Sequence, residues 1–209
     1  MYVPGVFSES NRERLFDFIE QHNFGLMISQ VEEAPFATHL PFLLERTEGP
    51  QGTLLGHLAR ANPHWKHLAH QSVLVVFAGP HAYITPRWYE ADEVVPTWNY
   101  TAVHVYGDIT LVEDEVDLIH LLSRMVHFEE RRSDQPWTMD PTETFLTRLL
   151  RQIVGFRLTI TRIEGKFKLS QNQPRDRRLK VIQALEQQGD DESRAMAQLI
   201  RQAMPPSLP

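Results

Sequence analysis

The chain has 209 residues, of which 42% are hydrophobic and 23% charged. This is a globular composition, long enough for one domain with appended helices or at most two small domains. The absence of cysteine excludes disulfides, thiol catalysis and cysteine-ligated metal sites, and the net charge of −6 argues against non-specific nucleic-acid binding as the main activity.

The beginning of the chain, Met-Tyr-Val-Pro-Gly-Val-Phe-Ser-Glu, lacks the basic start and the continuous apolar core of a signal peptide. No uncharged apolar run approaches the ~18–20 residues that a membrane-spanning helix needs. We therefore expect a soluble, cytoplasmic protein with no membrane contact.

The first half of the chain reads as one helix followed by short strands. Ser10 and Glu13 have the spacing of a capping box, which predicts a helix from about residue 10 to 22. Runs rich in β-branched and aromatic residues follow, broken by Gly, Pro or acidic turns. These runs are Phe24–Val31, Pro35–Glu45, Thr53–Arg60, Ser72–Ala78, His81–Thr85 and Val95–Val112. So many short strands in close succession indicate a barrel or a tightly bent sheet.

Helices interrupt this pattern in the second half, before one late strand. Asp114–Arg131 carries apolar residues at the spacing of a buried helical stripe, and Thr142–Gln152 resembles a second helix. Val154–Ile160 alternates apolar and polar residues, so we expect it to return to the sheet as a strand. Gly165 is expected to turn that strand into Lys166–Ser170.

The tail from Pro174 predicts two helices divided at Gly189, with Asp190 or Asp191 as the cap of the second. We therefore divide the chain into a β-rich domain over residues 1–173 and a helical C-terminal extension over residues 174–209.

A polar corner follows the third strand run, where Arg60 and Asn62 stand just before a short helix that begins near Pro63. An Arg and an Asn beside a helix N-terminus can collect an oxyanion, although an ordinary strand-to-helix corner has the same pattern. His64, His67 and His70 come next, and three-residue spacing drifts around a helix with no carboxylate at a ligand offset. We expect a solvated helix face there and no metal site.

Two further segments are rich in groups that a planar cofactor could use. Thr97-Trp98-Asn99-Tyr100 offers a large ring and an amide, although Trp and Tyr near strand ends are commonly packing residues. Lys166–Pro174 is dense in hydrogen-bond donors, and it either caps the following helix or delivers its donors to a phosphate or a ring edge. The residues alone leave both alternatives open in each segment.

Charge is unevenly distributed along the chain. From Arg157 to Lys180 there are eight basic residues and two acidic ones, so this segment carries +6 and the rest of the chain −12. A solvated basic helix face and an anion-binding role both fit that excess. Nucleophile elbows, Walker loops, dinucleotide fingerprints and zinc-protease motifs are all missing from the sequence, so no catalytic residue is predicted.

Six segments, taken in order, resemble the PaiB family of FMN-binding negative transcriptional regulators. They are the opening Met-Tyr-Val-Pro with Phe7, the run from Thr38 to Phe42, Gly56–Pro63, Gly79–Ile84, Val95–Tyr100 and Lys168–Asn172. This family belongs to the flavin split-barrel superfamily, whose members include relatives of pyridoxamine phosphate oxidase. The resemblance implies a mostly β protein with some α structure: an FMN-binding split β-barrel over residues 1–173, with peripheral helices and a helical C-terminal tail.

The resemblance also implies a flavin mononucleotide site at the interface of a homodimer. Thr38, His39, Leu40 and Pro41 are expected along the edge of the isoalloxazine ring. Near the phosphate or the ribityl chain we expect His57, Arg60 and Asn62. The remaining cofactor-binding residues implied are Trp98, Asn99, His104, Lys168, Ser170, Gln171 and Asn172, some of them from the partner subunit.

Two functions compete on this basis. The resemblance implies a flavin-binding repressor, and the basic helix over residues 175–180 is then the expected DNA contact, unless the protein acts indirectly. The alternative is a flavin-dependent oxidoreductase of unknown substrate, in which His39 or His104 could move protons. A site that holds haem, or that is vacant, is a third alternative.

Overall fold

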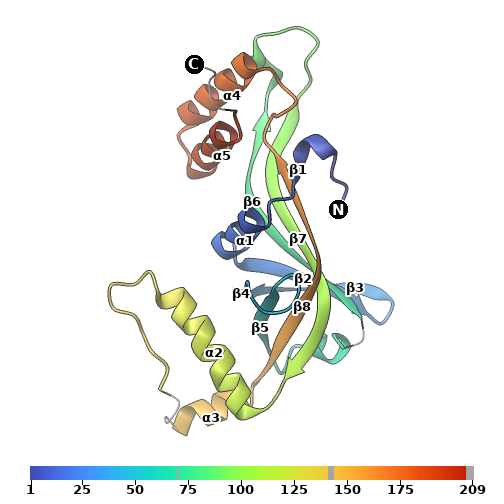
Figure 1. The fold of residues 1–209 in the computed structure, drawn as a ribbon, viewed down its shortest axis with the longest axis vertical. Helices are drawn as coiled ribbons and strands as arrows, with labels where there is room; N and C mark the ends of the chain where they lie inside the picture. The colour runs from blue at the N-terminus through green and yellow to red at the C-terminus, as the bar shows by residue number, and fades with distance from the viewer. Residues whose placement is uncertain (70, 141–143, 206–209) are drawn as a thin grey trace. The chain divides into compact units, whose positions relative to one another are not determined.

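The computed structural model describes residues 1–69, 71–140 and 144–205 of the chain. These residues cluster into two compact units. Unit 1 comprises Met1–Leu15, Ala78–Val103 and Glu164–Pro209, and unit 2 comprises Phe16–Phe77 and His104–Ile163. Three long strands, β6 (Ser72–Ile84), β7 (Thr97–Val112) and β8 (Ile153–Lys168), contribute residues to both units (Figure 1).

Antiparallel strands dominate the fold. The sheet has the order β3-β2-β6-β7-β8-β5-β4, and β1 (Ser8–Glu9) pairs with β8. The shorter strands of this order are β2 (Phe24–Val31), β3 (Ala34–Pro41), β4 (Leu43–Glu45) and β5 (Thr53–Ala59). The predicted β-rich barrel or bent sheet is therefore confirmed, and the first strand run has the predicted bounds.

In unit 2, the interior of the sheet is filled by aromatic and aliphatic side chains. The ring of Phe42 meets Phe77 and Phe156 edge-on, with centroids 5.5 and 5.9 Å apart. All three rings are almost fully buried. Edge-to-face packing of this kind adds about 0.5–1.5 kcal/mol per pair beyond the burial of area. Phe42 also interrupts the predicted run Pro35–Glu45, which the structure divides into β3 and β4.

The helix α2 (Glu115–Glu130) packs on the other face of β5. Leu55 of β5 and Leu43 of β4 form a cluster with Leu121 and Met125 of α2. Asp114 caps α2, since its carboxylate accepts the backbone N–H groups of Val116 and Asp117, so the predicted helix is confirmed. The following helix α3 (Thr144–Leu150) is shorter than predicted, and residues 142 and 143 of that prediction lie outside the described residues.

In unit 1, the tail forms the two predicted helices, α4 (Arg175–Gln188) and α5 (Asp191–Gln202), which pack against each other (Figure 1). Gly189 ends α4 with a φ of 79°, a left-handed conformation that glycine adopts without steric cost. Asp190 caps α5 by accepting the backbone N–H of Ser193. The division of the chain at residue 173 stays a prediction.

Two predictions about β6 and β8 are wrong. The runs Ser72–Ala78 and His81–Thr85 form one continuous strand, and Gly165 does not turn the chain but lies inside β8. Gly165 pairs with Glu9 of β1, and a Cβ atom at this position would lie 2.3 Å from Leu15 Cδ2. A glycine is needed here because β1 and the helix α1 (Arg12–Gln21) approach closely, not because the chain turns.

The predicted capping box of α1 is also wrong by one residue. Asn11, not Ser10, caps the helix, because its Oδ1 accepts the backbone N–H of Arg14 at 3.1 Å. Two hydrophilic residues in succession both suit a cap, and only the backbone conformation decides between them. Among the described residues, no helix is both long and apolar enough to cross a membrane.

Candidate functional site

A buried polar cluster lies in unit 2 where β2, β3 and the 3₁₀ helix η2 (Pro63–His67) meet. His64 has no exposed surface, and its Nε2 lies 2.8 Å from Ser29 Oγ. Its Nδ1 lies 2.8 Å from Thr38 Oγ1. Asn62 Nδ2 donates to the same Thr38 oxygen at 3.2 Å, and Asn62 Oδ1 accepts the backbone N–H of His64 at 3.0 Å. Both ring nitrogens of His64 are therefore engaged by hydroxyl groups.

The Thr38 oxygen therefore links Asn62 to His64. Because Asn62 Oδ1 accepts a backbone N–H, its Nδ2 must be the group that donates to Thr38. The Thr38 hydroxyl keeps one proton and a second acceptor site, so it can bond to His64 Nδ1 in either neutral form of the imidazole. Burial lowers the pKa of His64, with a smaller contribution from His67, which favours the neutral imidazole.

The solvated helix face predicted for His64, His67 and His70 is thus wrong at His64, because η2 turns that side chain inward. His67 is half-buried, and His70 lies outside the described residues. Within the described ranges, 1–69, 71–140 and 144–205, no group of three or more His, Cys, Asp or Glu residues could hold a metal ion.

The other predicted residues of β3 are divided between its two faces. Thr38 and Leu40 lie on one face, and Leu40 is buried. His39 and Pro41 lie on the opposite face, where the exposed His39 ring stacks near Phe24 at 6.2 Å. These residues therefore do not present a single row of side chains to one ligand.

His57 lies beneath α2 rather than beside the cluster. It shares a face of β5 with Leu55, which packs on α2, and it pairs with Gly155, where an added Cβ would lie 2.8 Å from Leu118 Cδ2. Its Nδ1 is buried and has no hydrogen-bond partner within the part of the chain that the structure describes. Burial lowers the pKa of His57.

Arg60 is occupied by the protein itself. Its Nε and Nη2 donate to the backbone carbonyls of Arg151 and Ile153 at 3.1 and 3.0 Å, and its Nη1 contacts Glu113 at 2.8 Å. These bonds anchor the corner after β5 to β8, which leaves the phosphate role predicted for Arg60 without support from the geometry. Asn62 likewise caps η2, as the alternative interpretation of this corner required.

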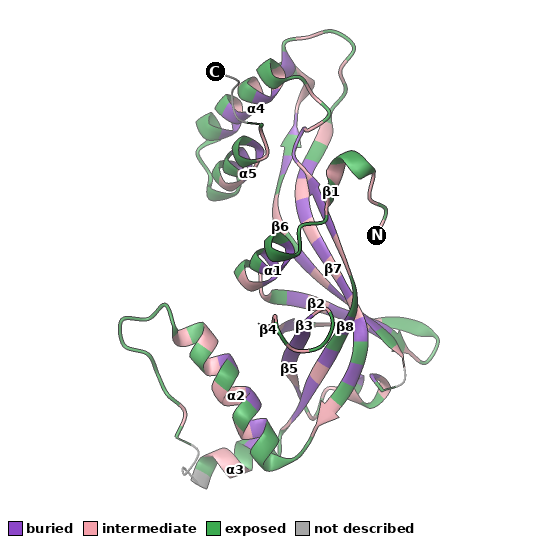
Figure 2. Cartoon of the chain, viewed as in Figure 1, coloured by how far each residue is buried: buried purple, intermediate pink, exposed green. Residues whose placement is uncertain are grey.

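In unit 1, Trp98 and Asn99 point to opposite faces of β7, as successive residues of a strand must. The Trp98 side chain is 53% exposed, whereas Asn99 has no exposed surface. Figure 2 shows that buried residues alternate with less buried ones along β7. Trp98 and Asn99 therefore do not present their ring and amide to the same face of the sheet.

Asn99 instead joins β7 to the end of β8. Its Nδ2 donates to Ser170 Oγ at 2.8 Å, while its Oδ1 is buried without a partner among the described residues. Ser170 has a φ of 59°, a left-handed conformation that non-glycine residues rarely adopt. An unsatisfied buried oxygen and a strained backbone in contact are together typical of functional sites.

The donors after β8 have different environments. Lys168 Nζ contacts Thr97 Oγ1 and lies 5.7 Å from the centre of the Phe7 ring. Gln171 folds back, since its amide accepts from Leu169 N–H and donates to the Phe167 carbonyl. These bonds do not cap α4, because its N-cap is Pro174, which has no side-chain cap hydrogen bond. Asn172 is exposed, and His104, in unit 2, is half-exposed with its ring 6.4 Å from Tyr106.

A second lysine, which the sequence did not single out, lies beside these residues. Lys166 is only 8% exposed, donates to the Tyr2 carbonyl at 3.0 Å and has the Tyr2 and Tyr100 rings within 5.4 and 5.2 Å. With Lys168 it forms a pair of cations surrounded by aromatic rings on one face of β8. The two-residue spacing of the lysines was the available signal, once β8 was known to continue past Gly165.

The predicted site residues thus form two groups, one in each unit. Thr38 and Asn62 meet at His64 in unit 2, and Asn99 meets Ser170 in unit 1, where Lys168 contacts Thr97. For three other predicted residues the structure gives different partners: Phe24 for His39, the Arg151 and Ile153 carbonyls for Arg60, and the Phe167 carbonyl for Gln171.

Comparison with known proteins supports the family resemblance. Residues 1–162 match the family described as "Putative FMN-binding domain". The chain is 35% identical over 202 residues to "Protease synthase and sporulation protein PAI 2" of Bacillus subtilis, covering 96% of each chain. It is also 30% identical over 253 residues to an uncharacterised protein of Aspergillus fumigatus, with 97% of each covered.

Solved structures confirm the split-barrel fold. The flavocytochrome Anf3 of Azotobacter vinelandii is similar with a TM-score of 0.59 and 16% identity, over 77% of this chain and 69% of that one. The FAD- and haem-binding protein of Mycobacterium smegmatis is similar with a TM-score of 0.56 and 16% identity, over 82% and 78%.

Proposed function

This chain belongs to the PaiB family of FMN-binding-domain proteins, and from that membership we propose that it binds flavin mononucleotide and acts as a regulator of gene expression. The single observation that carries the cofactor proposal is the match of residues 1–162 to a flavin-binding family, combined with the split-barrel fold. The regulatory role rests on the similarity to PAI 2, whose name connects that protein with protease synthesis and sporulation.

The donor sets in the structure fit the chemistry of FMN. A phosphate group and a ribityl chain need hydroxyl, amide and cationic donors, and an isoalloxazine ring needs a flat side chain and polar groups at its edge. In unit 1, such groups are Lys168 and the exposed Trp98. Unit 2, taken by itself, has Thr38 and Asn62. The buried and unpartnered Asn99 Oδ1 adds one unused acceptor.

When bound, FMN supplies the redox chemistry through its own ring. The residues of the chain bind and orient it. The Thr38 hydroxyl already bonds to Asn62 and His64, which leaves it one further hydrogen bond for a ligand, for example to a ribityl hydroxyl. Lys168 and the nearby Lys166 provide positive charge for a phosphate dianion.

This proposal is tested by the visible spectrum of the purified protein, recorded before and after dialysis against FMN and removal of the free FMN. We expect the absorption of oxidised flavin to remain after free FMN is removed. FMN is expected to be retained more strongly than FAD. No bound flavin at about 1 mM FMN, a concentration that reveals even about 4 kcal/mol of binding free energy, would overturn the proposal. A Soret band in its place would identify a haem site.

We also propose that the protein is a homodimer and that both subunits contribute to the flavin site. Size-exclusion chromatography with light scattering is then expected to give about twice the chain mass of 24.3 kDa. A monomer that nevertheless retains FMN would refute the shared site without affecting the cofactor proposal.

For direct contact with DNA, we propose the basic start of α4. All four cations at this helix start have partners within the chain: Lys180 pairs with Glu90 at 2.7 Å, Arg178 is buried against the Ile200 carbonyl, and Arg175 and Arg177 donate to Pro205 and Gln173. The net charge of the chain is −6. Binding of duplex DNA that weakens with salt is the expected result, and no binding at low salt would restrict the protein to indirect regulation.

A further inference from the structure

Exposed aromatic side chains gather on the neighbouring strands β6 and β7 of unit 1. Tyr83 and Trp98 are 47% and 53% exposed, with their rings edge-to-face at 5.7 Å. His81 adds a third ring, 5.9 Å from Trp98. Large aromatic side chains that remain exposed as a group on a soluble protein commonly mark a binding surface.

These rings line a cavity of about 380 Å³ that also includes Trp88 of the 3₁₀ helix η3 (Pro86–Tyr89). Asp190 and Glu192, at the start of α5, complete its wall with two carboxylates. Neither Lys nor Arg lines this cavity.

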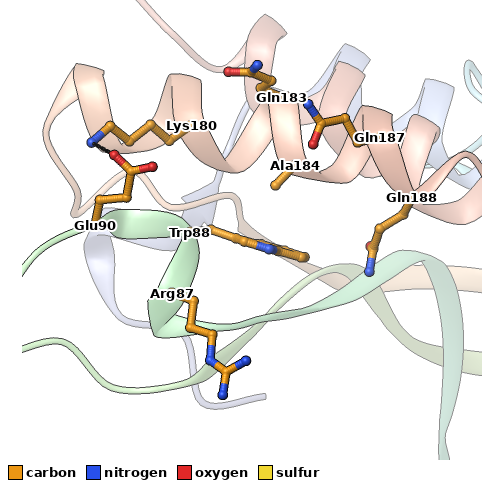
Figure 3. Close-up of a pocket in the computed structure, with 8 residues that line it drawn as sticks. All are labelled: Arg87, Trp88, Glu90, Lys180, Gln183, Ala184, Gln187 and Gln188. Carbon is orange, nitrogen blue, oxygen red and sulfur yellow. Dashed lines mark hydrogen bonds and ion pairs between the residues drawn. The ribbon is translucent and has the colours of Figure 1, made fainter.

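The cavity next to it has the opposite charge character, although the two share Trp88 and Gln188. Its volume is about 450 Å³, and Arg87 and Lys180 stand on its walls (Figure 3). Figure 3 shows Trp88 beneath Ala184 and α4, with Lys180 reaching Glu90 at one side. The cationic residues are therefore collected on one side of Trp88, and the first cavity keeps an acidic, aromatic lining.

Both carboxylates of the first cavity have defined partners within the chain. Asp190 accepts hydrogen bonds from Ser193, which lower its pKa, and it has no ion-pair partner among the described residues. Glu192 contacts His81 Nδ1 at 2.6 Å. Among the residues that the structure describes, neither carboxylate pairs with a lysine or an arginine.

We propose that this cavity binds a small organic cation with an alkylated or quaternary ammonium group. The electron-rich faces of Tyr83, Trp88 and Trp98 attract such a cation, and its alkyl groups weaken the hydration that a bare ammonium would have to lose on binding. Glu192, which also contacts His81, and Asp190 supply the countercharge, and none of the described residues that line the cavity is Lys or Arg. The proposal does not require bound flavin, and because Trp98 is shared with the proposed flavin site, it is tested in the protein free of FMN.

Titration calorimetry with choline tests the proposal, and 3,3-dimethylbutan-1-ol, which has the same shape without the charge, is the matched control. We expect choline to bind to the protein stripped of FMN, and the neutral analogue to bind at least about tenfold more weakly. Equal affinity of the two compounds, or no binding of choline to the stripped protein, would overturn the proposal.

Two variants locate the site. Glu192→Gln and Tyr83→Leu are each expected to weaken choline binding about two- to fivefold, the effect of one exposed charge or one ring face. The control is Glu186→Gln, which removes a charge of α4 that pairs with Arg201 and does not line the cavity. Unchanged affinity in both site variants, with circular dichroism showing that they are folded, would contradict the assignment.

Discussion

The hydroxyl of Thr38 connects Asn62 and His64, so its removal is the most direct test of the buried cluster in unit 2. Thr38→Val keeps the shape of the side chain but removes both the acceptor used by Asn62 Nδ2 and the hydroxyl that bonds to His64 Nδ1. Leaving the buried imidazole nitrogen without a partner costs about 1–3 kcal/mol, and the lost amide hydrogen bond about 1 kcal/mol more. We therefore expect the free energy of unfolding to fall by about 3 kcal/mol.

Urea denaturation followed by circular dichroism measures this loss, and thermal unfolding gives a second reading. A destabilisation of about 3 kcal/mol corresponds to a Tm lower by about 6–12 °C in a chain of this size. Thr38→Ser retains the hydroxyl and is expected to recover most of the loss, while Thr110→Val makes the same change at an exposed position of β7. The hydrogen-bond assignment fails if Thr38→Val is no less stable than Thr110→Val.

The remaining predictions concern both units. Trp98→Ala, which removes an exposed ring, is expected to reduce FMN retention in dialysis and to change the free energy of unfolding by no more than about 0.5 kcal/mol. Asn99→Ala is expected to destabilise the protein by about 1–3 kcal/mol even without FMN. Equal stability of the two variants in denaturation experiments would contradict their opposite placement. Gly165→Ala is expected to lower the Tm by several degrees because its Cβ would meet Leu15 and Glu9. Gly5→Ala, whose Cβ would have nothing within 4 Å, is expected to leave the Tm nearly unchanged. Equal Tm values for the two variants would refute the close approach of β1. Burial lowers the pKa of His57 below its ordinary value of 6.5, so the unfolded chain binds the proton more readily. Stability is therefore lost as the pH falls from 6.5 toward the folded-state pKa. His57→Leu is expected to reduce the dependence of the unfolding free energy on pH, measured by urea denaturation between pH 7.5 and 5, and an unchanged dependence would assign the effect to other groups.

Much of the secondary structure could be predicted because its signals are local. The apolar stripe after Asp114, the alternation in β2 and the glycine at position 189 depend on residues within one turn or one strand of each other. The wrong predictions share a cause. Gly165 is compatible with a turn, and only the approach of β1 and Leu15 explains it as a strand residue.

The candidate site shows the same limit more sharply. Arg60, Asn62 and His64 form a polar run that suggested an anion site with a solvated helix beside it. In the folded protein Arg60 bonds to carbonyls about ninety residues away in the chain, and His64 bonds to Ser29 and Thr38. No local pattern reveals such partners, because strand pairing brings together residues that are distant in sequence.

By itself, the sequence determined the fold class, because its strand runs and its helical tail indicate a bent sheet with appended helices, and the order of six segments carries the resemblance to the flavin split barrels. Only the tertiary structure decided which donors remain available to a ligand. Trp98 and Asn99 illustrate the physical reason, since adjacency in a strand sends one side chain to solvent and the next to the core. The sequence does not distinguish a hydrogen-bonding side chain that the fold uses internally from one that remains available to a cofactor.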